Sequence, residues 1–133
     1  MAGEGTVRVL IVDDQAPFRN AARTVVGLTP GFEVVGEASS GEEAVDLAAQ
    51  LGPDLVLMDI NLPGINGVEA VRRILAARAQ TVAFLLSTYS VGDLPQDARS
   101  CGAVAYVNKE DFGPSVLREL WDAGGDPTWQ RQN

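Results

Sequence analysis

The sequence lacks histidine, contains one cysteine and has no long apolar run, and each of these absences excludes a class of protein. Without histidine, and with only Cys101, the chain cannot form an internal disulfide or the Cys/His sites that bind structural zinc. No apolar segment approaches the roughly 20 residues that a membrane-spanning helix needs, and the first residues lack the pattern of a secretory signal. We therefore expect a cytoplasmic protein that does not interact with membranes.

Basic residues are also scarce: 10 lysines and arginines face 18 aspartates and glutamates, which gives a formal net charge of −8. A negative surface repels phosphate backbones, so we do not expect this chain to bind nucleic acid directly. Its 133 residues, 46% of them hydrophobic, suffice for one domain with a substantial core. We expect a flexible N-terminus over 1–6, a single domain over 7–123 and a polar C-terminal tail without a helix over 124–133.

Apolar segments of two kinds alternate along the chain. Short apolar runs predict buried strands, and apolar residues at helical spacing between them predict amphipathic helices. This alternation predicts a parallel sheet, because parallel neighbours need crossover connections of a dozen or more residues. The expected fold is α/β: a doubly wound, flavodoxin-like, five-stranded parallel sheet flanked by five helices. The predicted strands are 7–12, 32–38, 55–58, 83–86 and 104–107, and the last two predicted helices are 94–101 and 115–123.

Polar side chains follow four of the predicted strands. Asp13 and Asp14 end the first strand, Asp59 the third and Ser87 the fourth, and Lys109 closely follows the fifth. Ligands of open parallel sheets bind outside the carboxyl ends of the strands, so we expect these residues to share one crevice. Three carboxylates there would repel one another by about a few kcal/mol per close pair unless a cation or protons neutralise them. Mg²⁺, which prefers oxygen ligands, is the predicted cofactor.

The same set of residues suits phosphoryl transfer. A carboxylate can act as a nucleophile toward a phosphoryl donor, and cations then stabilise the charge on the transferred group. Lys109 and the metal would supply that positive charge. Ser87 would donate a hydrogen bond to a phosphoryl oxygen, although the adjacent Thr88 is a rival hydroxyl.

Four segments together make the chain resemble the receiver domains of two-component response regulators. They are VLIVDD at 9–14, LMDINLPG at 57–64, LS at 86–87, and GA with YVNK within 102–109. Each segment alone is weak evidence, but their order on the expected strands is highly specific, and the resemblance covers roughly 7–123. It implies a phosphoprotein that receives a phosphoryl group from a sensor histidine kinase or a phosphotransfer protein. It implies no enzymatic activity beyond self-dephosphorylation.

The resemblance also assigns roles at the site. Asp59 would be the phosphoacceptor and, with Asp14, a direct ligand of Mg²⁺. Asp13 would hold the metal through water, and Asn61 would contribute its backbone carbonyl. Lys109 would pair with the phosphoryl group.

Further roles concern the response to phosphorylation. Ser87 would move toward the modified aspartate, and Tyr106 would turn inward as the switch aromatic. Asn61 and Tyr89 would tune the lifetime of the phosphoryl group. Glu110 occupies a position where most family members have proline, often after a cis bond, so we expect a trans bond here.

Two ways of passing on the signal are compatible with the sequence. A free-standing receiver would contact a downstream protein through helix 94–101, strand 104–107 and helix 115–123, or would form a homodimer on phosphorylation. The segment 34–38 and the Lys-Glu pair at 109–110 resemble receivers joined to a helix-turn-helix output, so the alternative is a fragment of a DNA-binding transcriptional regulator.

Two other function classes fit the residues less well. A flavin mononucleotide binder has the same fold, but Asp13 and Asp14 would repel the flavin phosphate. A metal-dependent phosphohydrolase would use a second acid where Asn61 stands.

Overall fold

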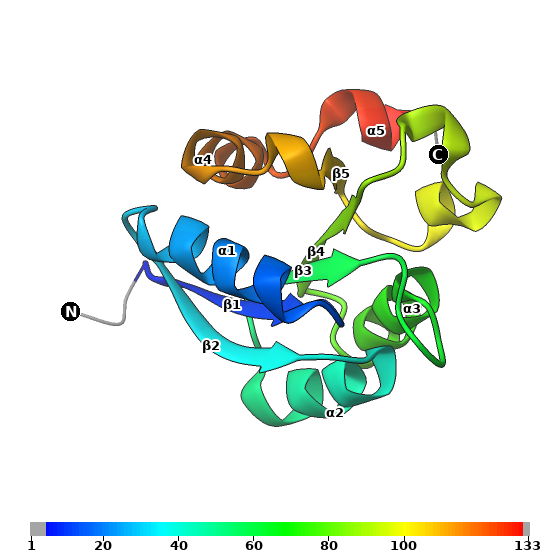
Figure 1. Cartoon of the computed structure of the whole chain (residues 1–133), viewed down its shortest axis with the longest axis horizontal. Helices are drawn as coiled ribbons and strands as arrows, with labels where there is room; N and C mark the ends of the chain where they lie inside the picture. The colour runs from blue at the N-terminus through cyan, green and yellow to red at the C-terminus, as the bar shows by residue number, and fades with distance from the viewer. Residues whose placement is uncertain (1–4, 132–133) are drawn as a thin grey trace.

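Five parallel strands form the centre of the computed structural model, which describes residues 5–131 (Figure 1). Their order across the sheet is β2-β1-β3-β4-β5, so the chain reverses its direction of winding after β2. The three central strands, β1, β3 and β4, are almost entirely buried apolar runs, as expected for a sheet covered on both faces, whereas the edge strands β2 and β5 are only partly buried. They span Val7–Val12 (β1), Phe32–Ala38 (β2), Leu55–Asp59 (β3), Val82–Ser87 (β4) and Ala105–Asn108 (β5).

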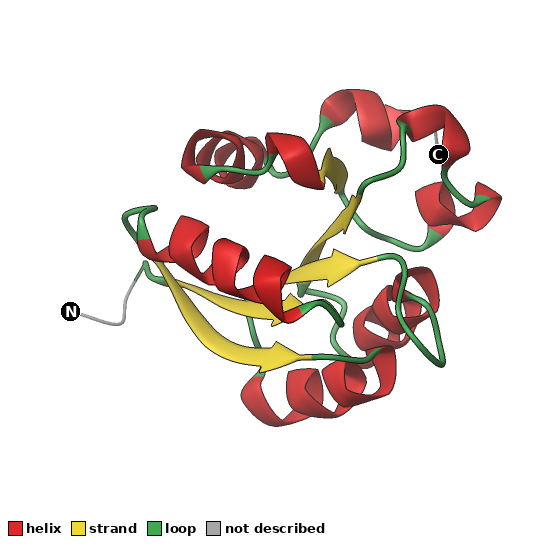
Figure 2. Ribbon diagram, viewed as in Figure 1, coloured by secondary structure: helices red, strands yellow, loops and turns green. Residues whose placement is uncertain are grey.

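Helices cover both faces of the sheet (Figure 2). One core cluster contains buried residues of α1 and α4, including Ala22, Val26 and Leu117. The other contains buried residues of α2 and α3, including Ala44 and Val71. The predicted doubly wound α/β fold is therefore confirmed. The helices span Ala16–Gly27 (α1), Gly41–Leu51 (α2), Gly67–Ala77 (α3), Pro114–Ala123 (α4) and Pro127–Arg131 (α5).

The expected helix over 94–101 was wrong. This stretch instead contains a short 3₁₀ helix, η2, over Gln96–Ser100, preceded by another, η1, over Val91–Asp93. Pro95 fixes where this short helix can begin, because its ring disfavours helical backbone at Leu94 and it stands at the N-cap of η2 with φ of −55° and ψ of 145°. The Ala98 N–H donates to the Pro95 carbonyl at 3.0 Å, the tighter pairing typical of a 3₁₀ helix.

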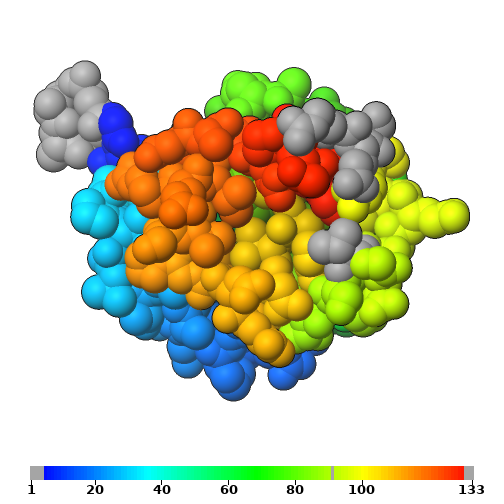
Figure 3. Space-filling model, turned by 90° about the horizontal axis from the view of Figure 1, so that it is seen from above, coloured from blue at the N-terminus to red at the C-terminus, as the bar shows by residue number. Residues whose placement is uncertain are grey.

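The chain after α4 also differs from the polar, helix-free tail predicted over 124–133. Gly124 and Gly125 adopt φ of 75° and 121°, which turns the chain back, and the Asp126 N–H donates to the Val104 carbonyl at 2.9 Å. The short helix α5 follows, and its Trp129 is only 3% exposed. Figure 3 shows α5, in red, packed between α4, in orange, and the yellow-green segment that contains η2. Within residues 5–131, every helix is too short or too polar to cross a lipid bilayer.

Candidate functional site

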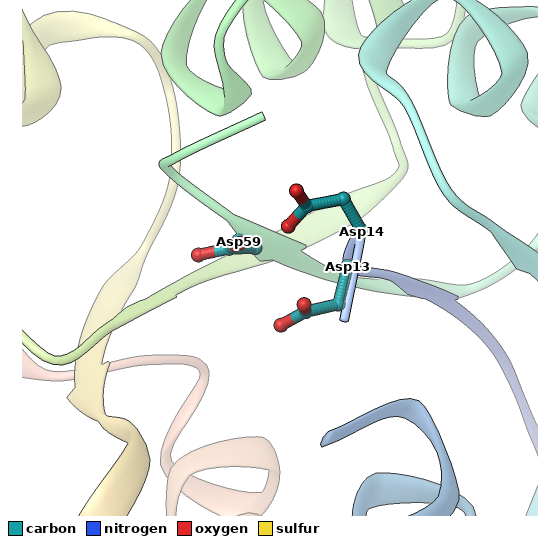
Figure 4. Close-up of side chains that lie close together, drawn as sticks. All are labelled: Asp13, Asp14 and Asp59. Carbon is teal, nitrogen blue, oxygen red and sulfur yellow. The ribbon is translucent and has the colours of Figure 1, made fainter. Parts of the chain in front are cut away.

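Three aspartates meet at the carboxyl edge of the sheet. Asp13 and Asp14 follow β1, and Asp59 ends the adjacent strand β3. One carboxylate oxygen from each lies within 4.8 Å of the others (Figure 4). Asp13 and Asp59 are buried, whereas Asp14 is exposed. The structure thus places together all three acids that the sequence singled out.

Lys109 faces this cluster from the turn after β5. Its Nζ lies 2.6 Å from Asp13 Oδ2 and 3.5 Å from Asp59 Oδ1. The ammonium also lies 4.6 Å from the ring centroid of Phe18, an apolar residue of α1. A cation over an aromatic face is stabilised by the ring quadrupole, so Phe18 helps to hold the lysine in place. The peptide bond before Glu110 is trans, as expected.

The electrostatics of Asp59 indicate a shortage of positive charge. The pKa of Asp59 is raised from 3.8 to about 6, because burial and the negative charge of Asp13 raise it by more than Lys109 and the Asn61 N–H lower it. Asp13 Oδ2 accepts no hydrogen bond from the described residues and has the Lys109 ammonium as its counter-charge. Because these carboxylates lack sufficient positive charge nearby, their oxygens form a set of ligands that fits a small divalent cation.

A cleft of about 320 Å³ opens above the cluster. Ser87, the last residue of β4, is 1% exposed, and its Oγ accepts a hydrogen bond from the Tyr89 N–H at 3.1 Å. The exposed Thr88 lines the same cleft, so both candidate residues contribute to its wall. The full lining is Asp14, Gln15, Asp59, Asn61, Ser87, Thr88 and Lys109.

Gln15 belongs to the site although the sequence gave no signal for it. Its backbone N–H donates to Asp13 Oδ1 at 2.8 Å, and its side-chain amide lies 3.5 Å from Asp14 Oδ2. These contacts orient both carboxylates of the pair. A single polar residue at a helix start is too common to predict such a role.

Asn61, which lines the cleft, and Tyr89 come from opposite loops and meet beside it. The Tyr89 hydroxyl donates to Asn61 Oδ1 at 3.2 Å, although the two residues are 28 positions apart in sequence. Asn61 is also tied to the phosphoacceptor candidate, because its backbone N–H lies 3.4 Å from Asp59 Oδ1.

Tyr106 lies behind Ser87, with its ring half-buried. Its hydroxyl donates to the Ser87 carbonyl at 3.2 Å and also contacts the Tyr89 carbonyl. Burial raises the pKa of Tyr106. The side chain therefore points toward the end of β4.

Gly67, the first residue of α3, lets that helix approach the site closely. A Cβ at this position would collide with the backbone carbonyl oxygen of Asp59 and lie 2.8 Å from its carbonyl carbon. The Gly67 N–H donates to the Ile60 carbonyl at 2.9 Å. The sequence shows only a glycine at a helix start, so this requirement becomes visible with the structure.

A parallel sheet with an acidic cleft at its carboxyl edge places the chain among the doubly wound α/β proteins. Within that class it belongs to the response regulator receiver domain family, because the family's model matches residues 9–121.

Two curated relatives and one solved structure illustrate the similarity. The chain is 32% identical over 126 residues to the nitrate/nitrite response regulator protein NarL of Escherichia coli K12, covering 92% of this chain and 57% of NarL. It is 35% identical over 117 residues to the transcriptional regulatory protein DegU of Brevibacillus brevis, covering 88% of this chain and 50% of DegU. The structure of a LuxR-family two-component response regulator from Aurantimonas sp. SI85-9A1 matches with a TM-score of 0.79 and 32% identity, covering 89% and 84% of the two chains. The chain thus spans about half the length of the curated relatives it matches.

Proposed function

We propose that this receiver domain is phosphorylated on Asp59, with Mg²⁺ as cofactor and a sensor histidine kinase or phosphotransfer protein as the donor. The observation that carries the proposal is the pairing of a buried Asp59, whose pKa is raised to about 6, with Asp14 and Lys109 at one cleft. The negative charge around the buried Asp59 is larger than the positive charge of Lys109. Such a carboxylate suits a reaction in which further cations bind around it.

The transfer step forms a bond between a carboxylate oxygen of Asp59 and phosphorus, while the bond from phosphorus to the donor's leaving group breaks and the leaving group keeps the electron pair. Lys109, at 3.5 Å from Asp59 Oδ1, would stabilise charge on the phosphoryl oxygens. Ser87 accepts a hydrogen bond from Tyr89, which leaves its own hydroxyl proton available for a phosphoryl oxygen. Bound Mg²⁺ would neutralise phosphoryl charge from a site made by Asp14, Asp59 and the Asn61 carbonyl, with Asp13 acting through water.

The response to phosphorylation would travel through the end of β4. Ser87 is the residue that would approach the phosphoryl group, and Tyr106 contacts the carbonyls of both Ser87 and Tyr89. Phosphorylation would favour the arrangement in which Ser87 is close to the phosphoryl group and Tyr106 contacts both carbonyls, and would thereby change which conformations of η2, β5 and α4 are populated. We propose the surface formed by these elements as the output face of a cytoplasmic signalling protein. We propose no turnover beyond loss of its own phosphoryl group.

Asn61 and Tyr89 would set how long the phosphoryl group survives. Their hydrogen bond joins the β3 and β4 loops beside the cleft, and water must enter this cleft to hydrolyse an aspartyl phosphate on Asp59. Closing the cleft would lengthen the lifetime.

A second candidate is the same chemistry within a longer transcriptional regulator. It is favoured by the match to DegU, which is named as a transcriptional regulatory protein and is twice as long as the matched region. In that case the output face would act on an attached DNA-binding part and not on a separate protein.

The phosphoacceptor proposal is tested by intact-mass measurement after incubation with Mg²⁺ and acetyl phosphate. We expect one added phosphoryl group in the wild-type protein and none in Asp59→Asn. Asp46→Asn, the same chemical change at an exposed position of α2, is the control and should still be modified. Equal modification of the Asp59→Asn protein would move the site elsewhere, and no modification of the wild-type protein would contradict the proposal.

A further inference from the structure

The short helix α5 is attached to the domain through one large side chain, Trp129. This side chain is 3% exposed, and its indole N–H donates to the Ala103 carbonyl at 3.1 Å. The Arg99 guanidinium covers the indole ring at 4.3 Å from its centroid. A helix of five residues is too short to be stable alone, so its position depends on these contacts.

A further neighbour of the indole is Tyr106. The two ring centroids lie 6.1 Å apart with an interplanar angle of 33°. The opposite end of the same tyrosine contacts the carbonyls of Ser87 and Tyr89, at the segment that carries the cleft hydroxyl. Tyr106 therefore connects α5 to the end of β4.

We propose that Trp129 is a positioning residue for the phosphoacceptor site and acts through Tyr106. Packing of Trp129 on the tyrosine ring holds the tyrosine hydroxyl on the two carbonyls, and this keeps the Ser87–Tyr89 segment in the arrangement seen here. The inference rests on the proposed phosphorylation of Asp59.

The direction of the effect follows from the hydrogen bonds of this segment. With the Tyr89 carbonyl held by Tyr106, the Tyr89 N–H donates to Ser87 Oγ, so the hydroxyl proton of Ser87 is directed elsewhere and is free for an acceptor in the cleft. If Tyr106 turned away, Trp129 would lose an aromatic neighbour and the segment would lose its hydroxyl contact. Docked α5 therefore stabilises the arrangement that can bind a phosphoryl group, and by linkage a bound phosphoryl group stabilises docked α5.

The test is the affinity of the full chain for beryllium fluoride, a stable phosphoryl mimic, in the presence of Mg²⁺. We expect Trp129→Ala to raise the apparent dissociation constant by roughly two- to tenfold, the range that corresponds to one aromatic pair. Trp129→Phe, which keeps an aromatic ring, should recover most of the affinity. The control is Trp121→Ala in α4, whose indole packs edge-on against Phe32 at 6.1 Å on the other face of the sheet, and which should leave the affinity unchanged.

Tyr106→Phe separates positioning from general destabilisation, because it removes only the hydroxyl contact. In that background, Trp129→Ala should cause little further loss of affinity. Full additivity of the two changes, unchanged affinity of Trp129→Ala, or an equal loss in Trp121→Ala would each overturn the inference.

A readout without any phosphoryl mimic distinguishes this inference from the proposed function. The backbone amide resonances of Ser87 and Tyr89 should shift in Trp129→Ala, and both should remain in place in Trp121→Ala. If the wild-type protein neither bound beryllium fluoride nor accepted a phosphoryl group, the proposed function would fail and the inference with it. Shifted amides together with normal phosphorylation but unchanged mimic affinity would overturn the inference alone.

Discussion

Replacing Asp59 with asparagine is expected to stabilise the metal-free protein at neutral pH, although it removes the proposed phosphoacceptor. The reason is the unfavourable position of the carboxylate, which is buried beside Asp13 with a pKa raised from 3.8 to about 6. Asparagine has nearly the same shape and carries no charge. The substitution also removes the attraction between Asp59 and Lys109, which opposes the gain in stability.

The magnitude follows from linkage between ionisation and folding. A difference between about 6 in the folded state and 3.8 in the unfolded state, at roughly 1.36 kcal/mol per pH unit, amounts to about 3 kcal/mol as an upper limit. Above pH 6 the carboxyl is ionised in both states, so the folded wild-type protein bears the whole penalty. As the pH falls from 6 to about 4 the folded state takes up the proton first, and the penalty disappears.

Urea denaturation of both proteins in EDTA measures the effect. At pH 7.5 we expect Asp59→Asn to be more stable by about 1–3 kcal/mol, and at pH 4 the difference should nearly vanish. Mg²⁺ at pH 7.5 should stabilise the wild-type protein more than the variant, because a cation bound by the three carboxylates removes the same repulsion. Asp46→Asn is the control and should show no pH-dependent difference. Equal stability of the wild-type and Asp59→Asn proteins at pH 7.5 would refute this reasoning. A difference in stability that is as large at pH 4 as at pH 7.5 would also refute it.

Substitutions at three further positions test local parts of the site. Gly67→Ala places a methyl group against the Asp59 carbonyl and should destabilise the protein by about 2–3 kcal/mol in urea denaturation, and a wild-type midpoint would contradict the close approach. Asn66→Ala removes the side-chain cap of α3 and should cost about 1 kcal/mol in the same assay, whereas Asn66→Asp should cost much less. Tyr89→Phe breaks the hydrogen bond to Asn61 and should shorten the half-life of the phosphorylated protein, followed by intact mass. An unchanged or longer half-life would show that this bond does not restrict water.

The strands and the acidic cluster were predictable because they depend on local sequence. A buried parallel strand is a continuous apolar run, and polar residues at the ends of adjacent parallel strands must lie at one edge of the sheet. Asp13, Asp14 and Asp59 were identified in this way. The position of Lys109 near these aspartates was also predictable, since Lys109 follows the fifth strand.

The parts that sequence reasoning missed depend on contacts between distant residues. The 3₁₀ form of residues 96–100 had no such local signal, because a proline at a helix start, such as Pro95, is equally compatible with an α-helix, as Pro17 and Pro114 show. Trp129 stands in a polar stretch, and its burial arises because two glycines reverse the chain and bring it against β5. The roles of Phe18 and Gln15 depend on side-chain orientation at the cleft, which no periodicity encodes.

The position of Lys109 has a consequence for the order of events at the cleft. Its ammonium is shared unequally between two aspartates, at 2.6 Å from Asp13 and 3.5 Å from Asp59, and Phe18 forms a wall beside it. Without a metal ion, the lysine ammonium thus supplies part of the positive charge that the aspartates need. A divalent ion that neutralised Asp13 would release the ammonium toward Asp59, where negative charge accumulates during transfer. Metal binding would then do more than occupy a site, because it would redistribute a charge that the protein already holds.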